Sequence, residues 1–256
     1  MATPESESFV RSFARGLVVI EALSEATSGQ TLNEIAASTG LSRTALRRFL
    51  LTLMDLGMVR TDEKRYWLTP RVLRLGLSYL ASLPYWREAQ FALEELSTRI
   101  NQSCALSVLD AGEIVYLQRQ HAKRILPMSP TLGSRMPAYC VSMGRVLLSG
   151  LDDDVLARYL ETVELKKLTP FTVTDRDRLR LELAKVGDQG YAWGEREFDE
   201  SIAGLAVPVR DMAGAVIAAI NVSLPAGEVS MEQAVADLLP SLQHTAARIR
   251  ASTRDH

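Results

Sequence analysis

Basic side chains gather on one face of a short helical segment, residues 43–53. The apolar residues Leu46, Phe49, Leu50 and Leu53 recur at the i, i+3, i+4, i+7 spacing of a buried helix face. The opposite face and the first turn carry Arg43, Thr44, Arg47 and Arg48. Guanidinium groups at the exposed N-terminal end of a helix suit the phosphates and base edges of the DNA major groove. The spacing therefore predicts a recognition helix.

The residues just before this segment predict a partner helix. Thr31 and Glu34 stand three apart, so each side chain can accept a hydrogen bond from the other's backbone N–H at a helix start. Gly40 tolerates positive φ between the two helices, and Ser42 can cap the second one. Residues 31–53 thus predict a helix-turn-helix. The alternative is an ordinary helical hairpin whose arginines are merely solvated.

A short hairpin with a basic tip is predicted after the helix pair. Residues 58–60 and 66–68 read as two strands, and the polar turn at 61–65 joins them. Such a hairpin is the wing of a winged helix, so Arg60, Lys64 and Arg65 would contact phosphate or the minor groove. A helix pair with a basic wing indicates DNA binding more specifically than the helix pair alone.

Composition and charge limit the other possibilities. The chain has 256 residues, 47% of them hydrophobic and 23% charged, which predicts one large or two modest globular domains. Net charge is -2, yet residues 41–75 hold eight basic residues against three acidic ones. Any affinity for nucleic acid is therefore local. Two cysteines and three scattered histidines indicate neither a disulfide framework nor a zinc site, and no apolar run approaches a membrane span. We expect a cytoplasmic protein without metal or cofactor.

The order of elements predicts an α+β protein of two domains. Residues 1–8 form a disordered lead, and residues 9–69 form the winged helix-turn-helix, which begins with a helix whose stripe Phe13, Leu17, Ile20 and Leu23 should be buried. Residues 70–84 form a leucine-rich linker helix, with packing into the next core as the alternative. Residues 85–252 form an α/β domain with strands near 104–109, 114–118, 204–209 and 215–224, further helices from Asp152 and from a cap at Thr174, and a terminal helix capped at Ser230.

A catalytic centre is hard to assemble from this chain. Ser103, Cys104 and Cys140 have no histidine partner in a motif context, and no phosphate-binding glycine loop occurs. The acidic run 152–154 could hold magnesium, but it is better explained as charge at a helix N-terminus. The run 194–200 could supply an acid pair, but it is more typical of a solvated loop. Cys140 could line a cavity or belong to the core.

The long segment GYAWGEREFDESIAGLAVPVRDMAGAVIAAINVSLP, residues 190–225, resembles the IclR family of bacterial transcriptional regulators, as does the predicted winged helix-turn-helix. The runs at 9–23, 31–53, 66–73 and 82–86 are similar to the branch that controls aromatic-acid catabolism through the β-ketoadipate pathway. The resemblance covers residues 8–252. It implies a GAF-like effector-binding C-terminal domain, homodimers or tetramers, a double-stranded DNA operator, and a small organic acid effector such as protocatechuate, 4-hydroxybenzoate or β-ketoadipate.

The resemblance also implies positions for the effector site. Relatives that bind small keto acids use a helix start, an acidic residue, a cysteine and two strand hydroxyls, which here match Ser142 and Met143, Gly194, Gly204, and Asn221 and Ser223. Losing the carboxylate and the thiol leaves a larger, less acidic site that could admit a ring or a longer acid. Tyr139, Met143 and Trp193 could pack on that ring. The two glycines could instead serve only turns.

Two alternatives to an effector-controlled regulator stay open at this point. One is a regulator that reads DNA without any ligand. The other is an enzyme on the domain at residues 85–252, with the N-terminal domain as a docking module; it lacks a nucleophile, metal or acid–base pair that we can assemble.

Overall fold

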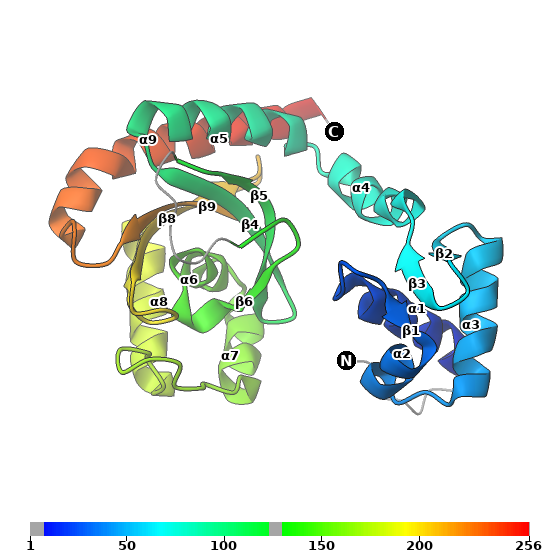
Figure 1. The fold of residues 1–256 in the computed structure, drawn as a ribbon. Helices are drawn as coiled ribbons and strands as arrows, with labels where there is room; N and C mark the ends of the chain where they lie inside the picture. Colours follow the sequence, from blue (N-terminus) through cyan, green and yellow to red (C-terminus); the bar gives the residue numbers. More distant parts are fainter. Residues whose placement is uncertain (1–7, 123–129, 256) are drawn as a thin grey trace. The chain divides into compact units, whose positions relative to one another are not determined.

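The computed structural model describes residues 8–122 and 130–255, so most of the predicted lead lies outside the described residues. The chain divides into two compact units, Met1–Ser82 and Leu83–His256 (Figure 1). Among the described residues, no helix has both the length and the apolar character needed to cross a membrane.

The first unit is a helical core with a small sheet. Its elements are α1 Arg11–Ser24, β1 Gln30–Thr31, α2 Leu32–Thr39, α3 Arg43–Asp55, β2 Val59–Thr61 and β3 Arg65–Leu68. The three strands pair antiparallel in the order β1-β3-β2. Val19, Ile35, Leu46 and Leu50 are buried at the centre of this unit. This is the predicted helix-turn-helix with its wing.

Local capping explains why α2 and α3 begin where they do. The Thr31 N–H donates to Glu34 Oε2 over 2.6 Å, and the Glu34 N–H donates to Thr31 Oγ1 over 3.3 Å. Gly40 ends α2 at a φ of 67°. The Ser42 hydroxyl then accepts the Ala45 N–H over 3.3 Å and opens α3. Each of these features agrees with the prediction from sequence.

The buried face of α1 differs from the predicted stripe. Of the predicted stripe, Leu23 is buried and Ile20 packs against the core, but Phe13 is 68% exposed and Leu17 is 42% exposed, while Val19 and Ala22 are buried. The helix therefore packs through a face that is rotated from the predicted one. Its first two turns leave their apolar side chains in solvent within this unit.

A second exposed apolar helix ends the first unit. The short turn η1 Pro70–Val72 leads into α4 Leu73–Ser82, where the linker helix was predicted. Leu73, Leu75 and Leu77 are each more than half exposed, and only Leu80 of this helix is buried.

The second unit is a six-stranded antiparallel sheet in the order β6-β5-β4-β9-β8-β7. The strands are β4 Ser103–Asp110, β5 Glu113–Gln120, β6 Arg135–Pro137, β7 Ala192–Glu195, β8 Ile202–Arg210 and β9 Val216–Pro225. The helices are α5 Trp86–Ile100, α6 Ser142–Ser149, α7 Asp153–Thr162, α8 Arg176–Gln189 and α9 Met231–Ala251, with short turns η2 Ala138–Cys140 and η3 Ser252–Asp255. Helices α5 and α9 cover one face, and α6 lies in the concave side of the curled sheet, with α7 and α8 beyond it (Figure 1).

The sequence located most of these elements but missed two short edge strands. The long strands and the terminal helix capped by Ser230 lie where they were predicted. Strands β6 and β7, of 3 and 4 residues, were not predicted. The cap of α8 is Asp175, whose Oδ1 accepts the Arg178 N–H over 2.7 Å, and not the predicted Thr174. The acidic run 152–154 lies at the start of α7, as its helix interpretation requires.

Candidate functional site

The predicted recognition residues lie together on α3. Arg43, Thr44, Arg47 and Arg48 are all exposed, whereas Leu46 and Leu50 of the same helix are buried. No ion pair occupies these three arginines among the described residues. The helix therefore presents a free cationic surface at its N-terminal half, which suits contact with a polyanion.

The hairpin of β2 and β3 has a tip ordered by one carboxylate. Asp62 Oδ1 accepts the Arg65 N–H over 2.7 Å and the Lys64 N–H over 3.0 Å, and these donors lower the pKa of the Asp62 carboxyl. Lys64 stands exposed at the tip. The Arg60 guanidinium lies 4.5 Å from the centre of the Trp67 ring, which fixes its direction.

Arg65 differs from the other predicted wing residues because its guanidinium is already engaged. Its Nη1 donates to the Gly29 carbonyl over 2.8 Å and lies 3.7 Å from Glu34 Oε2. Arg65 thus fastens the wing to the start of α2. The sequence could not show this contact, because Gly29 is 36 residues away along the chain.

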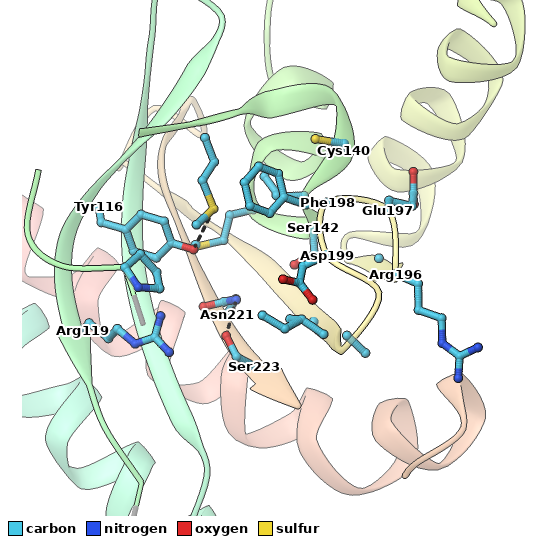
Figure 2. A pocket seen from close by; sticks show the side chains of 18 residues that line it. Tyr116, Arg119, Cys140, Ser142, Arg196, Glu197, Phe198, Asp199, Asn221 and Ser223 are labelled. Atoms are coloured by element: carbon cyan, nitrogen blue, oxygen red, sulfur yellow. Dashed lines mark hydrogen bonds between the residues drawn. The ribbon is translucent and has the colours of Figure 1, made fainter. Parts of the chain in front are cut away.

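A cavity opens between the start of α6 and the concave face of the sheet (Figure 2). Inside the cavity, a volume of about 60 Å³ is open to the centres of water molecules. The described residues that line the cavity are Tyr116, Arg119, Pro130, Met136, Cys140, Val141, Ser142, Met143, Gly194, Arg196, Glu197, Phe198, Asp199, Ile202, Ala203, Gly204, Asn221 and Ser223. Six of the eight predicted effector residues are among them: Ser142, Met143, Gly194, Gly204, Asn221 and Ser223.

The two glycines make room for the cavity. Gly194 of β7 pairs with Gly204 of β8, and neither has a positive φ, so they do not serve turns. A Cβ at Gly204 would lie 2.9 Å from Ser142 Oγ and 3.6 Å from Asn221 Nδ2. A Cβ at Gly194 would lie 3.4 Å from the Ser142 backbone nitrogen. Side chains at these positions would project toward the start of α6.

Tyr139 and Trp193 do not line the cavity, contrary to the prediction. The Tyr139 side chain is buried in η2, and its hydroxyl donates to the Lys166 carbonyl over 2.8 Å. Trp193 neighbours Gly194 on β7, and successive strand residues point to opposite faces of a sheet, so Trp193 points away from the cavity. The aromatic wall is instead made by Tyr116 and Phe198.

Arg119 is a cavity residue that the sequence did not single out. Its Nε and Nη2 are buried atoms with no hydrogen-bond partner among the described residues, and desolvation lowers the pKa of the guanidinium. Asn221 lies near it (Figure 2). The Asn221 Nδ2 donates to Ser223 Oγ over 3.2 Å, while the Oδ1 is buried and has no hydrogen-bond partner in the described parts of the chain. The only signal in the sequence was the position of Arg119 one residue beyond the predicted strand.

Buried ion pairs hold the loop at residues 196–199, which lines one side of the cavity. Arg145 of α6 lies 2.5 Å from Glu197 and 2.8 Å from Glu182, and its Nε donates to the Tyr139 carbonyl over 3.1 Å. The Thr172 hydroxyl also donates to the Glu197 carbonyl over 2.6 Å. Burial raises the pKa of the Glu197 carboxyl. Residues 194 and 195 of this run thus belong to β7, and residues 196–200 form a loop that is held by buried contacts. The prediction that the run is a solvated loop is wrong at Glu197, which is buried.

The two cysteine thiols are poorly suited to nucleophilic catalysis because burial keeps them protonated. Cys140 lines the cavity and is also buried in the core, so both interpretations that the sequence left open for it are correct. Burial raises the pKa of Cys140 and of Cys104 to about 12 each. Within residues 8–122 and 130–255, no group of three or more histidine, cysteine or acidic side chains could hold a metal ion.

Two family models match this chain. Residues 12–63 match the IclR helix-turn-helix domain, and residues 77–251 match the C-terminal domain of bacterial transcriptional regulators of the IclR type. The first range covers the helix-turn-helix and ends before β3, and the second runs from within α4 through most of the unit that holds the cavity. The family resemblance drawn from the sequence is confirmed.

Individual relatives agree with the family models. The chain is 37% identical over 235 residues to the Pca regulon regulatory protein of Pseudomonas putida, covering 91% of this chain and 81% of that protein. It is 36% identical over 250 residues to the p-hydroxybenzoate hydroxylase transcriptional activator of Acinetobacter baylyi, covering 96% and 92%. A solved double mutant of the PobR inducer-binding domain from Acinetobacter, in complex with 3-hydroxybenzoic acid, is 33% identical with a TM-score of 0.59, covering 63% of this chain and 95% of that one. The chain belongs to the IclR family of bacterial transcriptional regulators, which bind DNA through a helix-turn-helix and are not enzymes.

Proposed function

We propose that this protein is a homo-oligomeric regulator of aromatic-compound catabolism whose affinity for its DNA operator is set by a small aromatic or dicarboxylic acid. The acid binds in the cavity between α6 and the sheet. The names of the two curated relatives, which concern the Pca regulon and p-hydroxybenzoate hydroxylase, support the pathway.

Operator reading falls to the first unit. Arg43, Thr44, Arg47 and Arg48 enter the major groove from the exposed face of α3. Arg60 and Lys64 hold the phosphate backbone from the wing, where both side chains are exposed. Arg65 takes part only by leaving Gly29 and Glu34, so its share of the phosphate contact is smaller than first expected.

The unpartnered polar atoms around Arg119 are the observation that carries the effector proposal. Two buried guanidinium donors and one buried amide oxygen face the cavity, and none of them has a hydrogen-bond partner within residues 8–122 and 130–255. Leaving such groups unpaired costs about 1–3 kcal/mol each, and more for a charged one. A carboxylate would satisfy Arg119 with charge-assisted hydrogen bonds. Arg119 and Asn221 both pair with Ala105 of β4, so their side chains share one face of the sheet, and the Asn221 amide donates to the Ser223 hydroxyl.

The rest of the cavity suits a small ring. Tyr116, Met136, Met143 and Phe198 give it apolar walls, and the Ser107 hydroxyl holds the Met143 sulfur at 3.2 Å. The volume open to the centres of water molecules is about 60 Å³ in this cavity. A single enclosed water needs roughly 10–15 Å³ of such volume, so the cavity has room for several waters or one small ligand. The space is that of a compact molecule. The 3-hydroxybenzoic acid complex of the related inducer-binding domain supports an aromatic acid.

Oligomerisation would couple the cavity to the operator. The exposed apolar residues of α1 and α4, such as Phe13, Leu73 and Leu77, are surfaces that a second copy would cover. An acid that binds one arrangement of the paired chains more tightly than the other shifts the population toward that arrangement. The size of the shift is limited by the difference between the two affinities.

A ligand screen tests this proposal. The full-length protein is titrated with aromatic and dicarboxylic acids, and its thermal transition is followed with and without operator DNA. We expect at least one acid to stabilise the protein and to change its operator affinity. Arg119→Gln should abolish that shift, whereas Arg180→Gln, an exposed arginine on α8, should keep it. If no acid shifts the transition, the protein is a regulator without an effector. If an acid is consumed, the C-terminal unit has a catalytic activity that the family models do not indicate.

A further inference from the structure

We propose that Asp199 selects the effector, by accepting a hydrogen bond from a donor group on the acid and by excluding a second carboxylate. The effector would then be a monocarboxylic aromatic acid that carries a hydroxyl or amino group, and dicarboxylic acids would be rejected. This proposal rests on the proposed function, because it names which acid the same cavity accepts.

One oxygen of Asp199 is fully used and the other is free. Asp199 Oδ1 accepts the Ser201 N–H over 2.8 Å and the Ser201 hydroxyl over 2.5 Å. Asp199 Oδ2 has no hydrogen-bond partner within residues 8–122 and 130–255. Figure 2 shows this carboxylate directed into the cavity. The hydrogen bonds from Ser201 lower the pKa of the Asp199 carboxyl, so it is ionised at neutral pH.

Asp199 and Arg119 stand at opposite sides of the cavity. Arg119 lies on β5, and Asp199 lies in the loop between β7 and β8. Strands β4 and β9 separate β5 from β8 in the sheet. At ~4.8 Å a strand, the curled sheet places β5 and β8 up to roughly 14 Å apart. A ligand whose carboxylate pairs with Arg119 therefore turns its far end toward Asp199.

The other charged groups near Asp199 do not neutralise it. Arg196 lines part of the cavity, but its guanidinium lies 5.6 Å from the centre of the Phe171 ring and 3.8 Å from Glu195, and it is directed away from Asp199 (Figure 2). Arg145 is already bound by Glu197 and Glu182. A second carboxylate at this end would thus meet a like charge, which disfavours its binding. A hydroxyl would instead gain a charge-assisted hydrogen bond.

The test compares matched acids on matched variants. Isothermal titration of the full-length protein uses benzoate, hydroxybenzoate, methoxybenzoate and benzene dicarboxylate, the last three in both the meta and para forms. Asp199→Asn keeps the acceptor for Ser201 and removes the charge. Glu200→Gln is the control, because Glu200 is the next residue, is exposed and does not line the cavity.

In the wild type, we expect one hydroxybenzoate to bind at least about tenfold more tightly than benzoate and than the corresponding methoxybenzoate. A tenfold difference in affinity is about 1.4 kcal/mol. The dicarboxylates should bind at least as weakly as the ethers. Asp199→Asn should lose most of the preference for the hydroxyl and bind a dicarboxylate at least about tenfold more tightly than the wild type. Glu200→Gln should match the wild type.

The outcomes separate this proposal from the one it rests on. If Asp199→Asn folds and keeps the wild-type order of affinities, selection by Asp199 is overturned while acid binding stands. If the wild type itself binds a dicarboxylate as tightly as the hydroxy acids, selection is overturned without any variant. If none of the acids in the wider screen binds the wild type, both proposals fail.

Discussion

Arg145 of α6 and Glu197 of the loop after β7 form a buried ion pair, with 2.5 Å between Nη2 and Oε2. Arg145 lies three residues after Ser142, and Glu197 lies two residues before Asp199. The pair therefore joins the helix start on one side of the cavity to the loop that carries its acidic wall. A contact that fixes both walls should matter for folding as well as for ligand binding.

Removing Arg145 should destabilise the protein strongly. In Arg145→Met the Glu197 carboxylate stays buried without its partner, and breaking such a pair costs about 3–5 kcal/mol. Adding Glu197→Gln should recover part of that loss, because burial disfavours the charged form of Glu197 and the second change removes that charge. Urea unfolding measures both variants. Arg178→Met, which breaks an exposed pair with Glu182, should cost less than about 1 kcal/mol. Equal losses for Arg145→Met and Arg178→Met would contradict a role for burial.

The two glycines should differ in their effect on acid binding. Gly204→Ala puts a methyl group 2.9 Å from Ser142 Oγ. The hydroxyl can rotate aside, but the methyl group and the rotated hydroxyl then reduce the space left for the ligand. We expect at least about a tenfold loss of affinity for the acid, about 1.4 kcal/mol. Gly194→Ala meets only an ordinary contact at 3.4 Å and should lose less. Titration of both variants gives the order, and a reversed order would mean that the ligand lies nearer to β7 than proposed.

The recognition helix and the wing should contribute differently to DNA binding. Arg47→Ala should lower affinity for the operator by about 1–3 kcal/mol and affect nonspecific DNA less. Lys64→Ala should weaken both alike and reduce the salt dependence by about one phosphate contact. Fluorescence anisotropy across a salt series measures these terms, with Lys185→Ala on α8 as the control. Equal losses for the first two variants on both DNAs would refute the division.

Both cysteines should react slowly in the folded protein. A thiol whose pKa is raised to about 12 is only about one part in ten thousand thiolate at pH 8, and that fraction grows roughly tenfold with each unit of pH. A chromogenic disulfide reagent should label Cys104 and Cys140 only after denaturation. Thr98→Cys, at an exposed position of α5, reports the rate of an accessible thiol. Rapid labelling of native Cys140 would show that the cavity wall is open.

Features set by interactions between nearby residues could be predicted from the sequence, and features set by distant contacts could not. Thr31, Glu34 and Gly40 act within one helical turn or at one backbone position, so the helix-turn-helix could be predicted from adjacent residues. The contact between Arg145 and Glu197 spans 52 residues, and nothing local in an apolar helix marks that arginine as paired. Trp193 was misplaced because β7 is too short to show its alternation, and without a strand its direction cannot be assigned.

The cavity residues show the same limit. Ser142, Gly194, Gly204 and Asn221 were found through resemblance to a family, which carries spatial information that a single chain lacks. Arg119 was missed because its lack of partners appears only when its surroundings are known.

The facing pair of Gly194 and Gly204 has a consequence for how this protein evolves. Neither residue has a positive φ, so the backbone conformation itself does not require glycine at either position, although a Cβ at Gly204 would displace the Ser142 hydroxyl. A small side chain gained at either position would then reduce the size of the cavity, because its Cβ would project toward the start of α6. Descendants of this chain can therefore change which nutrient they sense while the operator-binding surface stays the same.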